Sequence, residues 1–151
     1  EMRQRLLSIN PSADIQAICQ RYDEDTSSQF TFDNYDYVID AIDTLDNKAL
    51  LIYQATCSSA TLFSSMGAGR KLDATRIRTT EFWKVSGCPL ARALRNKMRK
   101  SGHMPQKKFQ CVYSDEISSE SGTIAPIVGV FGMYLSHLLI QDIIRKANEQ
   151  E

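Results

Sequence analysis

The sequence lacks the short motifs that mark a self-sufficient nucleotide-binding or zinc-binding domain. None of its seven glycines belongs to a GxGxxG or Walker-type phosphate loop. The four cysteines, Cys19, Cys57, Cys88 and Cys111, form no CxxC pair, which disfavours a structural zinc site. They are also too few for a secreted disulfide scaffold, and the amino terminus does not have the pattern of a signal peptide. We therefore expect reduced thiols in a cytoplasmic protein.

The sequence also has no net charge, since eighteen acidic side chains balance eighteen basic ones. Overall charge therefore predicts neither nucleic-acid nor membrane affinity. The basic residues are unevenly placed, because residues 84–108 contain no acid. The basic side chains of that stretch are Lys84, Arg92, Arg95, Lys97, Arg99, Lys100, Lys107 and Lys108. Such a run is either a solvated face or a surface that meets a polyanion.

Hydrophobic periodicity predicts a single domain of 151 residues in which helices and strands alternate. Helices are expected at residues 2–9, 45–58, 89–100 and 127–148, with one helical turn near 27–30. Strands are expected at residues 13–19, 37–41, 60–66, 76–82 and 109–114, and a linker at 115–122. Strands separated by helical crossovers predict an α/β fold with a mostly parallel sheet. The apolar run 124–144 contains polar residues and a proline, which favours a buried amphipathic helix over an integral membrane segment.

The segment VIDAIDTLDNK, residues 38–48, is the strongest local signal. A buried strand would end near Asp40, with Asp43 just beyond it and before a helix. Ligands of open parallel sheets bind outside the carboxyl ends of the strands. A carboxylate there can hold Mg²⁺ that bridges nucleotide phosphates, and Lys48 could reach a phosphate oxygen. Spacing alone instead favours Asp43 or Thr44 as the cap of the following helix.

Other candidate residues carry weaker signals. Gly67 and Gly69 follow the next strand at the same edge and either allow close approach of a ligand or form a plain turn. Cys88 stands at a helix start, where a thiolate is stabilised, and it is a weak candidate for catalysis. The two histidines, His103 and His137, are interpreted as structural, and His137 is expected in the core.

Five segments follow one another in the order known from one superfamily. They are RLLSINP (5–11), YDYVIDAIDTLDNKALLI (35–52), MGAGRKLDATRIRTTEF (66–82), PLARALRNKMRK (89–100) and CVYSDE (111–116). Together they resemble the ThiF/MoeB/HesA superfamily of adenylating enzymes, and within it the tRNA threonylcarbamoyladenosine dehydratase branch. The resemblance implies a Rossmann-like fold with helices on both faces of the sheet and antiparallel additions in the second half. It also implies that this chain is the carboxyl-terminal part, with the phosphate loop in an amino-terminal half that the chain lacks.

The resemblance further implies a reaction and a set of binding residues. In the superfamily the second aspartate of D-x-x-D serves Mg²⁺·ATP, which corresponds to Asp43 as the metal residue. The implied ATP-binding set is Asp23, Asp25, Thr26, Asp40, Asp43, Lys48, Gly67 and Gly69. The implied reaction is adenylation of the threonylcarbamoyl carboxylate on a tRNA adenosine, followed by ring closure with loss of AMP. The implied contacts with tRNA phosphates are Arg92, Arg95, Arg99, Lys100, Lys107 and Lys108. A homodimer is expected by resemblance as well.

Two alternatives stay open. One is an activating enzyme for a ubiquitin-like sulfur-carrier protein, which would bring sulfur-transfer partners. That branch often has paired CxxC ligands and a crossover cysteine, and this chain has neither. The other is an inactive dimerisation fragment. The chain also has Cys88 where many relatives have aspartate, and it has no cysteine between residues 116 and 122, so no thiol role can be carried over.

Overall fold

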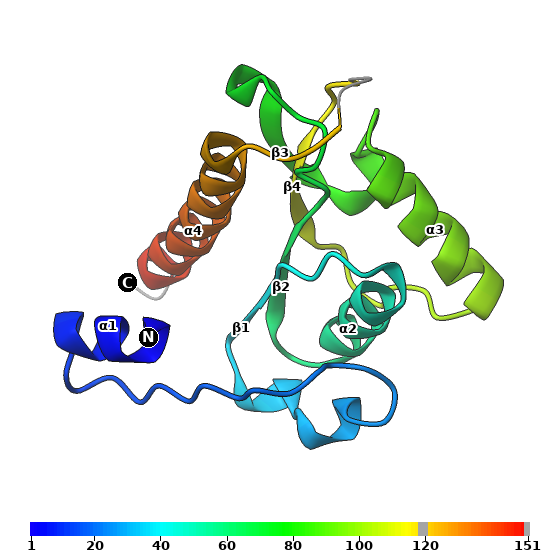
Figure 1. Cartoon of the computed structure of the whole chain (residues 1–151). Coiled ribbons are helices and arrows are strands. Elements are labelled where there is room, and N and C mark those ends of the chain that lie inside the picture. The colour runs from blue at the N-terminus through cyan, green and yellow to red at the C-terminus, as the bar shows by residue number, and fades with distance from the viewer. Residues whose placement is uncertain (118–120, 150–151) are drawn as a thin grey trace.

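A sheet of three parallel strands and one antiparallel strand organises the chain (Figure 1). The computed structural model describes residues 1–117 and 121–149, and within them the sheet has four strands in the order β1-β2-β4-β3. The strands are β1 (Tyr37–Asp40), β2 (Thr61–Ser65), β3 (Ile77–Glu81) and β4 (Gln110–Ser114). Only β3 is antiparallel, and it pairs with β4. The predicted mostly parallel α/β sheet with a late antiparallel addition is confirmed.

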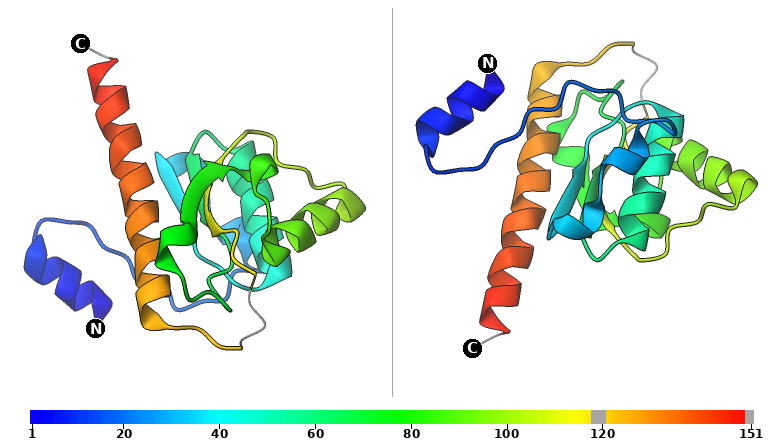
Figure 2. Two further views of the ribbon diagram at one scale, coloured as in Figure 1. Left: turned by 90° about the horizontal axis from the view of Figure 1, so that it is seen from above. Right: turned by 90° about the horizontal axis from the view of Figure 1, so that it is seen from below.

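Helices cover both faces of this sheet (Figures 1 and 2). The helix α2 (Leu45–Cys57) is the crossover that parallel pairing of β1 and β2 requires, and α3 (Pro89–Ser101) packs beside it. The helix α4 (Ala125–Asn148) covers the opposite face. The helix α1 (Met2–Ile9) buries no residue and lies on the α4 side, at the end of an extended segment. Short 3₁₀ turns are η1 (Ser27–Gln29), η2 (Phe32–Asn34), η3 (Ala74–Arg76) and η4 (Phe82–Lys84).

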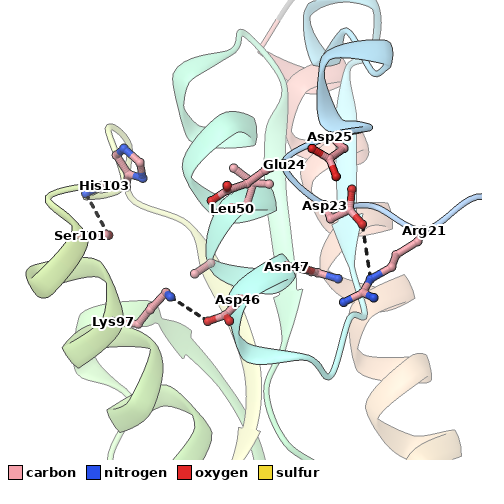
Figure 3. A pocket seen from close by; sticks show the side chains of 11 residues that line it. Arg21, Asp23, Glu24, Asp25, Asp46, Asn47, Leu50, Lys97, Ser101 and His103 are labelled. Atoms are coloured by element: carbon pink, nitrogen blue, oxygen red, sulfur yellow. Dashed lines mark hydrogen bonds and ion pairs between the residues drawn. The ribbon is translucent and has the colours of Figure 1, made fainter.

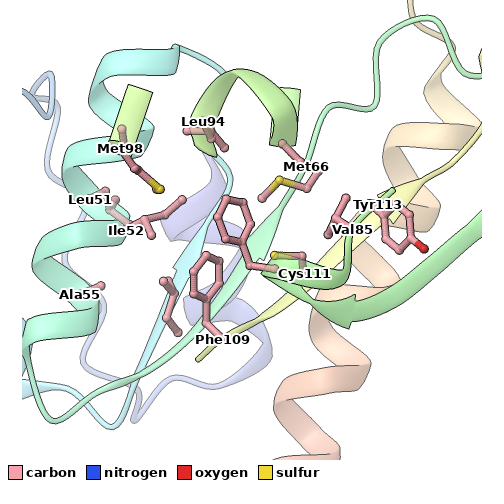
Figure 4. Close-up of a cluster of buried hydrophobic side chains, with 14 of the residues drawn as sticks. Leu51, Ile52, Ala55, Met66, Val85, Leu94, Met98, Phe109, Cys111 and Tyr113 are labelled. Atoms are coloured by element: carbon pink, nitrogen blue, oxygen red, sulfur yellow. The ribbon is translucent and has the colours of Figure 1, made fainter. Parts of the chain in front are cut away.

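Two hydrophobic clusters hold the layers together. The cluster under α2 and α3 is built around Ile52, Leu94 and Phe82, all fully enclosed, and Phe82 stacks on Phe109 at 4.9 Å (Figure 4). The cluster under α4 joins strand residues to Ile127, Phe131 and Leu135. Each such side chain contributes about 1.5–3 kcal/mol by leaving water. Because successive strand residues point to opposite faces, one strand such as β2 supplies both clusters.

The helix α4 is buried along one stripe only. Ile127, Phe131 and Leu135 are buried against the sheet, whereas Met133 is 73% exposed and Ile140 is 52% exposed. The prediction of a buried helix is therefore wrong for its outer face. By length and composition alone α4 could cross a membrane, which is weak evidence, and its packing on β2 and β4 makes it part of the domain. The absence of a membrane segment stays a prediction.

The predicted strand at residues 13–19 is wrong. That segment has no strand partner among the described residues, and Ile18 is 58% exposed. Its alternating apolar pattern fits a strand, but a strand needs a pairing partner, and the sheet of residues 1–117 and 121–149 supplies none for it. The other predicted strands and helices are confirmed within two residues at each end, and the predicted turn is η1. The predicted linker at 115–122 lies partly outside the described residues.

Candidate functional site

A buried ion pair lies at the carboxyl end of β1. Asp40 and Lys48 are both 0% exposed, and Lys48 Nζ donates to Asp40 Oδ2 at 2.6 Å. The same oxygen accepts from Ser64 Oγ at 2.6 Å. Removing one partner of such a pair costs about 3–5 kcal/mol, because the other charge is left buried. In this structure the Lys48 ammonium is enclosed and bound to Asp40 and the Ile42 carbonyl, which speaks against the predicted contact with a phosphate oxygen, and the Asp40 carboxylate is enclosed with it.

Asp43, in contrast, is exposed three residues beyond the end of β1. Thr44 is the N-cap residue of α2, but its side chain makes no capping hydrogen bond. In the part of the chain that the structure describes, no hydrogen bond or ion pair involves the Asp43 carboxylate. Capping therefore does not explain these two residues. The Asp43 carboxylate is available to a ligand at the edge where parallel sheets bind them.

The predicted acidic loop lines a cavity of about 480 Å³ against α2 and α3 (Figure 3). Asp23 and Asp25 lie there, together with Glu24. Thr26 does not line it, but its hydroxyl accepts from the Asp23 N–H at 3.1 Å and donates to the Arg21 carbonyl at 2.6 Å. Thr26 therefore shapes the loop. Asp43 is not among the residues that line this cavity. Asp43 and the acidic loop, which belong to the same predicted ATP-binding set, therefore do not line one common cavity.

The acidic loop is attached to α2 by Tyr22. Its hydroxyl donates to Gln54, whose amide in turn donates to Ser27 Oγ at 3.1 Å. Burial raises the pKa of Tyr22 to about 12, so this hydroxyl keeps its proton at neutral pH. The loop that carries Asp23 and Asp25 is thus held in place by a polar contact that the sequence did not reveal.

The wall of the cavity also contains an ion pair that sequence reasoning missed. Lys97 of α3 pairs with Asp46 of α2 at 2.8 Å, and both line the cavity beside His103 (Figure 3). His103 stacks on Tyr53 at 4.7 Å and is exposed. His137 is exposed as well, so its predicted place in the core is wrong. A helical wheel of α3 would have separated Lys97 from the other basic residues.

The two predicted glycines and Cys88 lie together in a second cavity of about 440 Å³. It is formed by the turn after β2, the start of α3 and the end of β4, and its lining includes Gly67, Gly69, Lys71, Cys88, Leu90 and Glu116. A Cβ at Gly67 would lie 3.5 Å from Leu90, which is an ordinary van der Waals contact, so packing within this chain does not require a glycine there. Cys88 is only 6% exposed.

Glu116 joins two loops at this edge of the sheet. Its carboxylate accepts the N–H groups of Leu72 at 2.9 Å and Asp73 at 3.0 Å. Its own carbonyl accepts from the buried Lys71 ammonium. The loop after β2 and the segment after β4 are therefore fastened together. The sequence shows Glu116 as part of the CVYSDE segment but does not show this contact.

Three of the predicted basic contacts share a groove of about 320 Å³ on α3. Arg92, Arg95 and Arg99 line it at helical spacing. Arg95 lies over the Phe82 ring at 5.5 Å and donates to the Val85 carbonyl, and its buried Nε has no partner among the described residues.

The remaining predicted basic contacts lie outside this groove. Lys107 holds the main-chain carbonyls of Ser58 and Ala60, the latter at 2.9 Å, so it has a structural role. Lys100 and Lys108 are exposed but do not line the groove. The six predicted contacts therefore do not form one surface.

These features define an α/β domain that offers a free carboxylate and two cavities at or near the carboxyl edge of a mostly parallel sheet. A model of the ThiF family matches residues 1–151, and the chain belongs to this family. The family predicted from the five segments is thereby confirmed.

Individual relatives and solved structures show which members of the family this chain is similar to. The tRNA threonylcarbamoyladenosine dehydratase of Bacillus subtilis (strain 168) is 38% identical over 115 residues, which are 76% of this chain and 44% of that protein. The protein of that name from Escherichia coli (strain K12) is 32% identical over 120 residues, 76% of this chain and 45% of that protein. The E. coli enzyme in complex with ATP has a TM-score of 0.88 at 28% identity, covering 99% of this chain and 65% of that one. Its complex with AMP has a TM-score of 0.83 at 29% identity, covering 97% and 64%. This chain thus spans about half the length of the curated relatives it matches.

Proposed function

We propose that this chain is the carboxyl-terminal part of an ATP-dependent adenylating enzyme that acts on the threonylcarbamoyl group of tRNA. The likeness over 99% of the chain to an E. coli dehydratase in complex with ATP carries this proposal. The B. subtilis and E. coli relatives named for the same activity support it. The phosphate loop belongs to the other part of the enzyme, because this sequence contains no such motif.

In the proposed reaction the substrate carboxylate attacks the α-phosphorus of ATP. The bond from that phosphorus to pyrophosphate breaks, and an acyl-adenylate forms. An atom of the same substrate then attacks the acyl carbon, AMP leaves, and the ring closes. This chain contributes the edge of the sheet where Asp43 lies and the loop that carries Asp23 and Asp25.

The residues present fit a magnesium ion that is shared with a nucleotide. Mg²⁺ prefers oxygen ligands and is often held by one or two carboxylates together with phosphates and water. No group of three or more potential ligand side chains occurs in residues 1–117 and 121–149, so these residues do not form a complete metal site by themselves, and Asp43 is the ligand that we propose from this chain. When bound, the ion would offset negative charge on the phosphates as pyrophosphate departs.

Replacing Asp43 with alanine in the whole enzyme tests this role. We expect Mg²⁺-dependent exchange between ATP and pyrophosphate to be lost while the fold stays intact. The matched control is Asp36→Ala, since Asp36 is also exposed but precedes β1 at the opposite end of the strand. Unchanged exchange in Asp43→Ala would remove the residue from the site.

The arginine groove supports a nucleic-acid substrate. Arg92 and Arg99 are exposed along one face of α3, and Arg99 lies over the Trp83 ring at 5.8 Å, which limits its motion. We propose that these two guanidinium groups contact tRNA phosphates, with Arg95 as their packed support. The logarithm of the affinity falls as the logarithm of the salt concentration rises. Each lost phosphate contact should make this fall less steep by about 0.9.

The double variant Arg92→Glu/Arg99→Glu should therefore lose tRNA retention at low salt. Arg5→Glu on α1, which is also exposed but far from the groove in sequence and fold, is the control. Equal retention by both variants would make the groove an ordinary solvated surface.

The partner and location proposals rest on the resemblance. A homodimer and a cytoplasmic location are proposed, with sulfur-transfer partners only under the alternative function. The exposed apolar stripe on α4, which includes Val128, Met133 and Ile140, is a surface that a second copy could cover. Analytical ultracentrifugation of the whole enzyme tests the dimer, and a monomer at micromolar concentration would contradict it.

A further inference from the structure

We infer that the buried Asp40–Lys48 pair positions Asp43, so that both members act on the ATP site without touching the ligand. This inference rests on the proposed role of Asp43. The turn between β1 and α2 carries Asp43, and its stability decides where that carboxylate points.

The pair holds the residue directly before Asp43 from both sides. Asp40 Oδ1 accepts the N–H of Ile42 at 3.0 Å, and Lys48 Nζ donates to the carbonyl of Ile42 at 3.0 Å. That carbonyl belongs to the planar peptide bond that joins Ile42 to Asp43. The ammonium group therefore fixes the orientation of this peptide plane, and with it the backbone position of Asp43. The carboxylate of Asp40 is also held by Ser64 of β2.

The turn is consequently tied to three elements at once. Asp40 belongs to β1, Ser64 to β2 and Lys48 to α2. All three side chains are 0% exposed, so water does not compete for these hydrogen bonds. Asp43 itself is exposed, which is the arrangement expected of a ligand held on a rigid base.

Stability alone does not account for this pair. Replacing a buried ion pair by apolar side chains of similar volume is often neutral or stabilising, since two charges lose their hydration on burial. An apolar pair, however, cannot hold the Ile42 carbonyl. What Asp40 and Lys48 add is therefore a fixed orientation of the peptide bond between Ile42 and Asp43.

The test is the double variant Asp40→Asn/Lys48→Met in the whole enzyme. The asparagine oxygen still accepts from the Ile42 N–H, and its amide nitrogen can donate to the Ser64 hydroxyl oxygen, but the ammonium group is removed from the Ile42 carbonyl. Isothermal titration should show that ATP binding needs about 10–100-fold more Mg²⁺, as is usual when support behind a metal ligand is lost. In the 151-residue chain, the amide of Ile42, which donates to Asp40, should exchange faster with solvent as the turn loosens.

Two controls separate positioning from general stability. Ser64→Ala removes one hydrogen bond to Asp40 but leaves both contacts with Ile42, so the Mg²⁺ requirement should rise much less than in the double variant. Leu94→Ala in the core should cost about 2–5 kcal/mol of stability and leave that requirement unchanged. If either control shifts the requirement as much as the double variant does, the inference is overturned.

The outcomes also separate this inference from the proposed function. A shift in Asp43→Ala with none in the double variant keeps the role of Asp43 and overturns the positioning role. No shift in Asp43→Ala overturns both. If the double variant does not fold, Lys48→Arg alone is titrated in the same way, because it keeps a positive charge beside Asp40 but changes the position of the donor at the Ile42 carbonyl. It should give a smaller shift, and no shift at all would again overturn the inference.

Discussion

Replacing Glu116 is the sharpest test of how the carboxyl edge of the sheet is held together. This side chain belongs to a residue only 8% exposed, and its carboxylate accepts hydrogen bonds from two consecutive main-chain N–H groups. The donors, Leu72 and Asp73, are 44 and 43 residues away in sequence. Loss of this acceptor should release the loop after β2 from the segment after β4.

The size of the effect follows from the number of bonds and their access to water. A hydrogen bond to a charged group contributes about 1.5–3 kcal/mol. Leu72 is 52% exposed, so water can partly replace the acceptor and the lower end of that range applies. We expect Glu116→Ala to lower the free energy of unfolding by about 2–3 kcal/mol. Glu116→Gln can keep the oxygen that accepts both N–H groups but loses the negative charge, so it should lose about half as much.

Urea unfolding at neutral pH measures the change, and hydrogen exchange locates it at the amides of Leu72 and Asp73. Asp115→Ala is the control, because its carboxylate forms a partly exposed pair with Arg76 at 2.9 Å. Such pairs contribute about 0–1 kcal/mol. A loss below about 0.5 kcal/mol in Glu116→Ala would refute the reasoning, since that is the range of ordinary surface substitutions. Unchanged exchange at the two amides would refute it as well.

Three further predictions concern stability, nucleotide binding and catalysis. Burial raises the pKa of Asp142, but hydrogen bonds from Arg145, Lys146 and Tyr37 outweigh this and hold it at about 2. This stabilisation is present above the unfolded pKa of about 4 and is lost as pH falls towards about 2. Asp142→Asn should therefore cost about 1–2 kcal/mol at pH 7 and progressively less below pH 4, measured by urea unfolding. The 151-residue chain alone should bind ATP no tighter than about 1 mM by calorimetry, and micromolar binding would contradict the placement of the phosphate loop elsewhere. Cys88→Ser should keep pyrophosphate exchange in the whole enzyme, whereas a loss of about 100-fold would establish a catalytic thiol.

The sequence by itself determined most of the secondary structure and the family. Periodic apolar residues are a local property, so the helix at 45–57 and the strand at 37–40 could be predicted from their own residues. The acid-ended strand placed Asp43 at the carboxyl edge of the sheet for the same reason. The five segments in order were sufficient for the superfamily, because they extend over nearly the whole chain.

Only the tertiary structure decided what the polar side chains contact. Lys48 follows Asp43 by five residues on a helix, yet it points inward to Asp40, because the ammonium group finds a buried carboxylate and a carbonyl there. Glu116 meets Leu72 across 44 residues, and no local pattern predicts that contact. The segment 13–19 has the alternation of a strand but pairs with no strand in the described part of the chain, and pairing depends on a neighbouring edge that a local pattern does not show. VIDAIDTLDNK thus indicated the edge of the sheet at which we propose the site, and packing decided that Asp43 is exposed there while Asp40 and Lys48 are buried behind it.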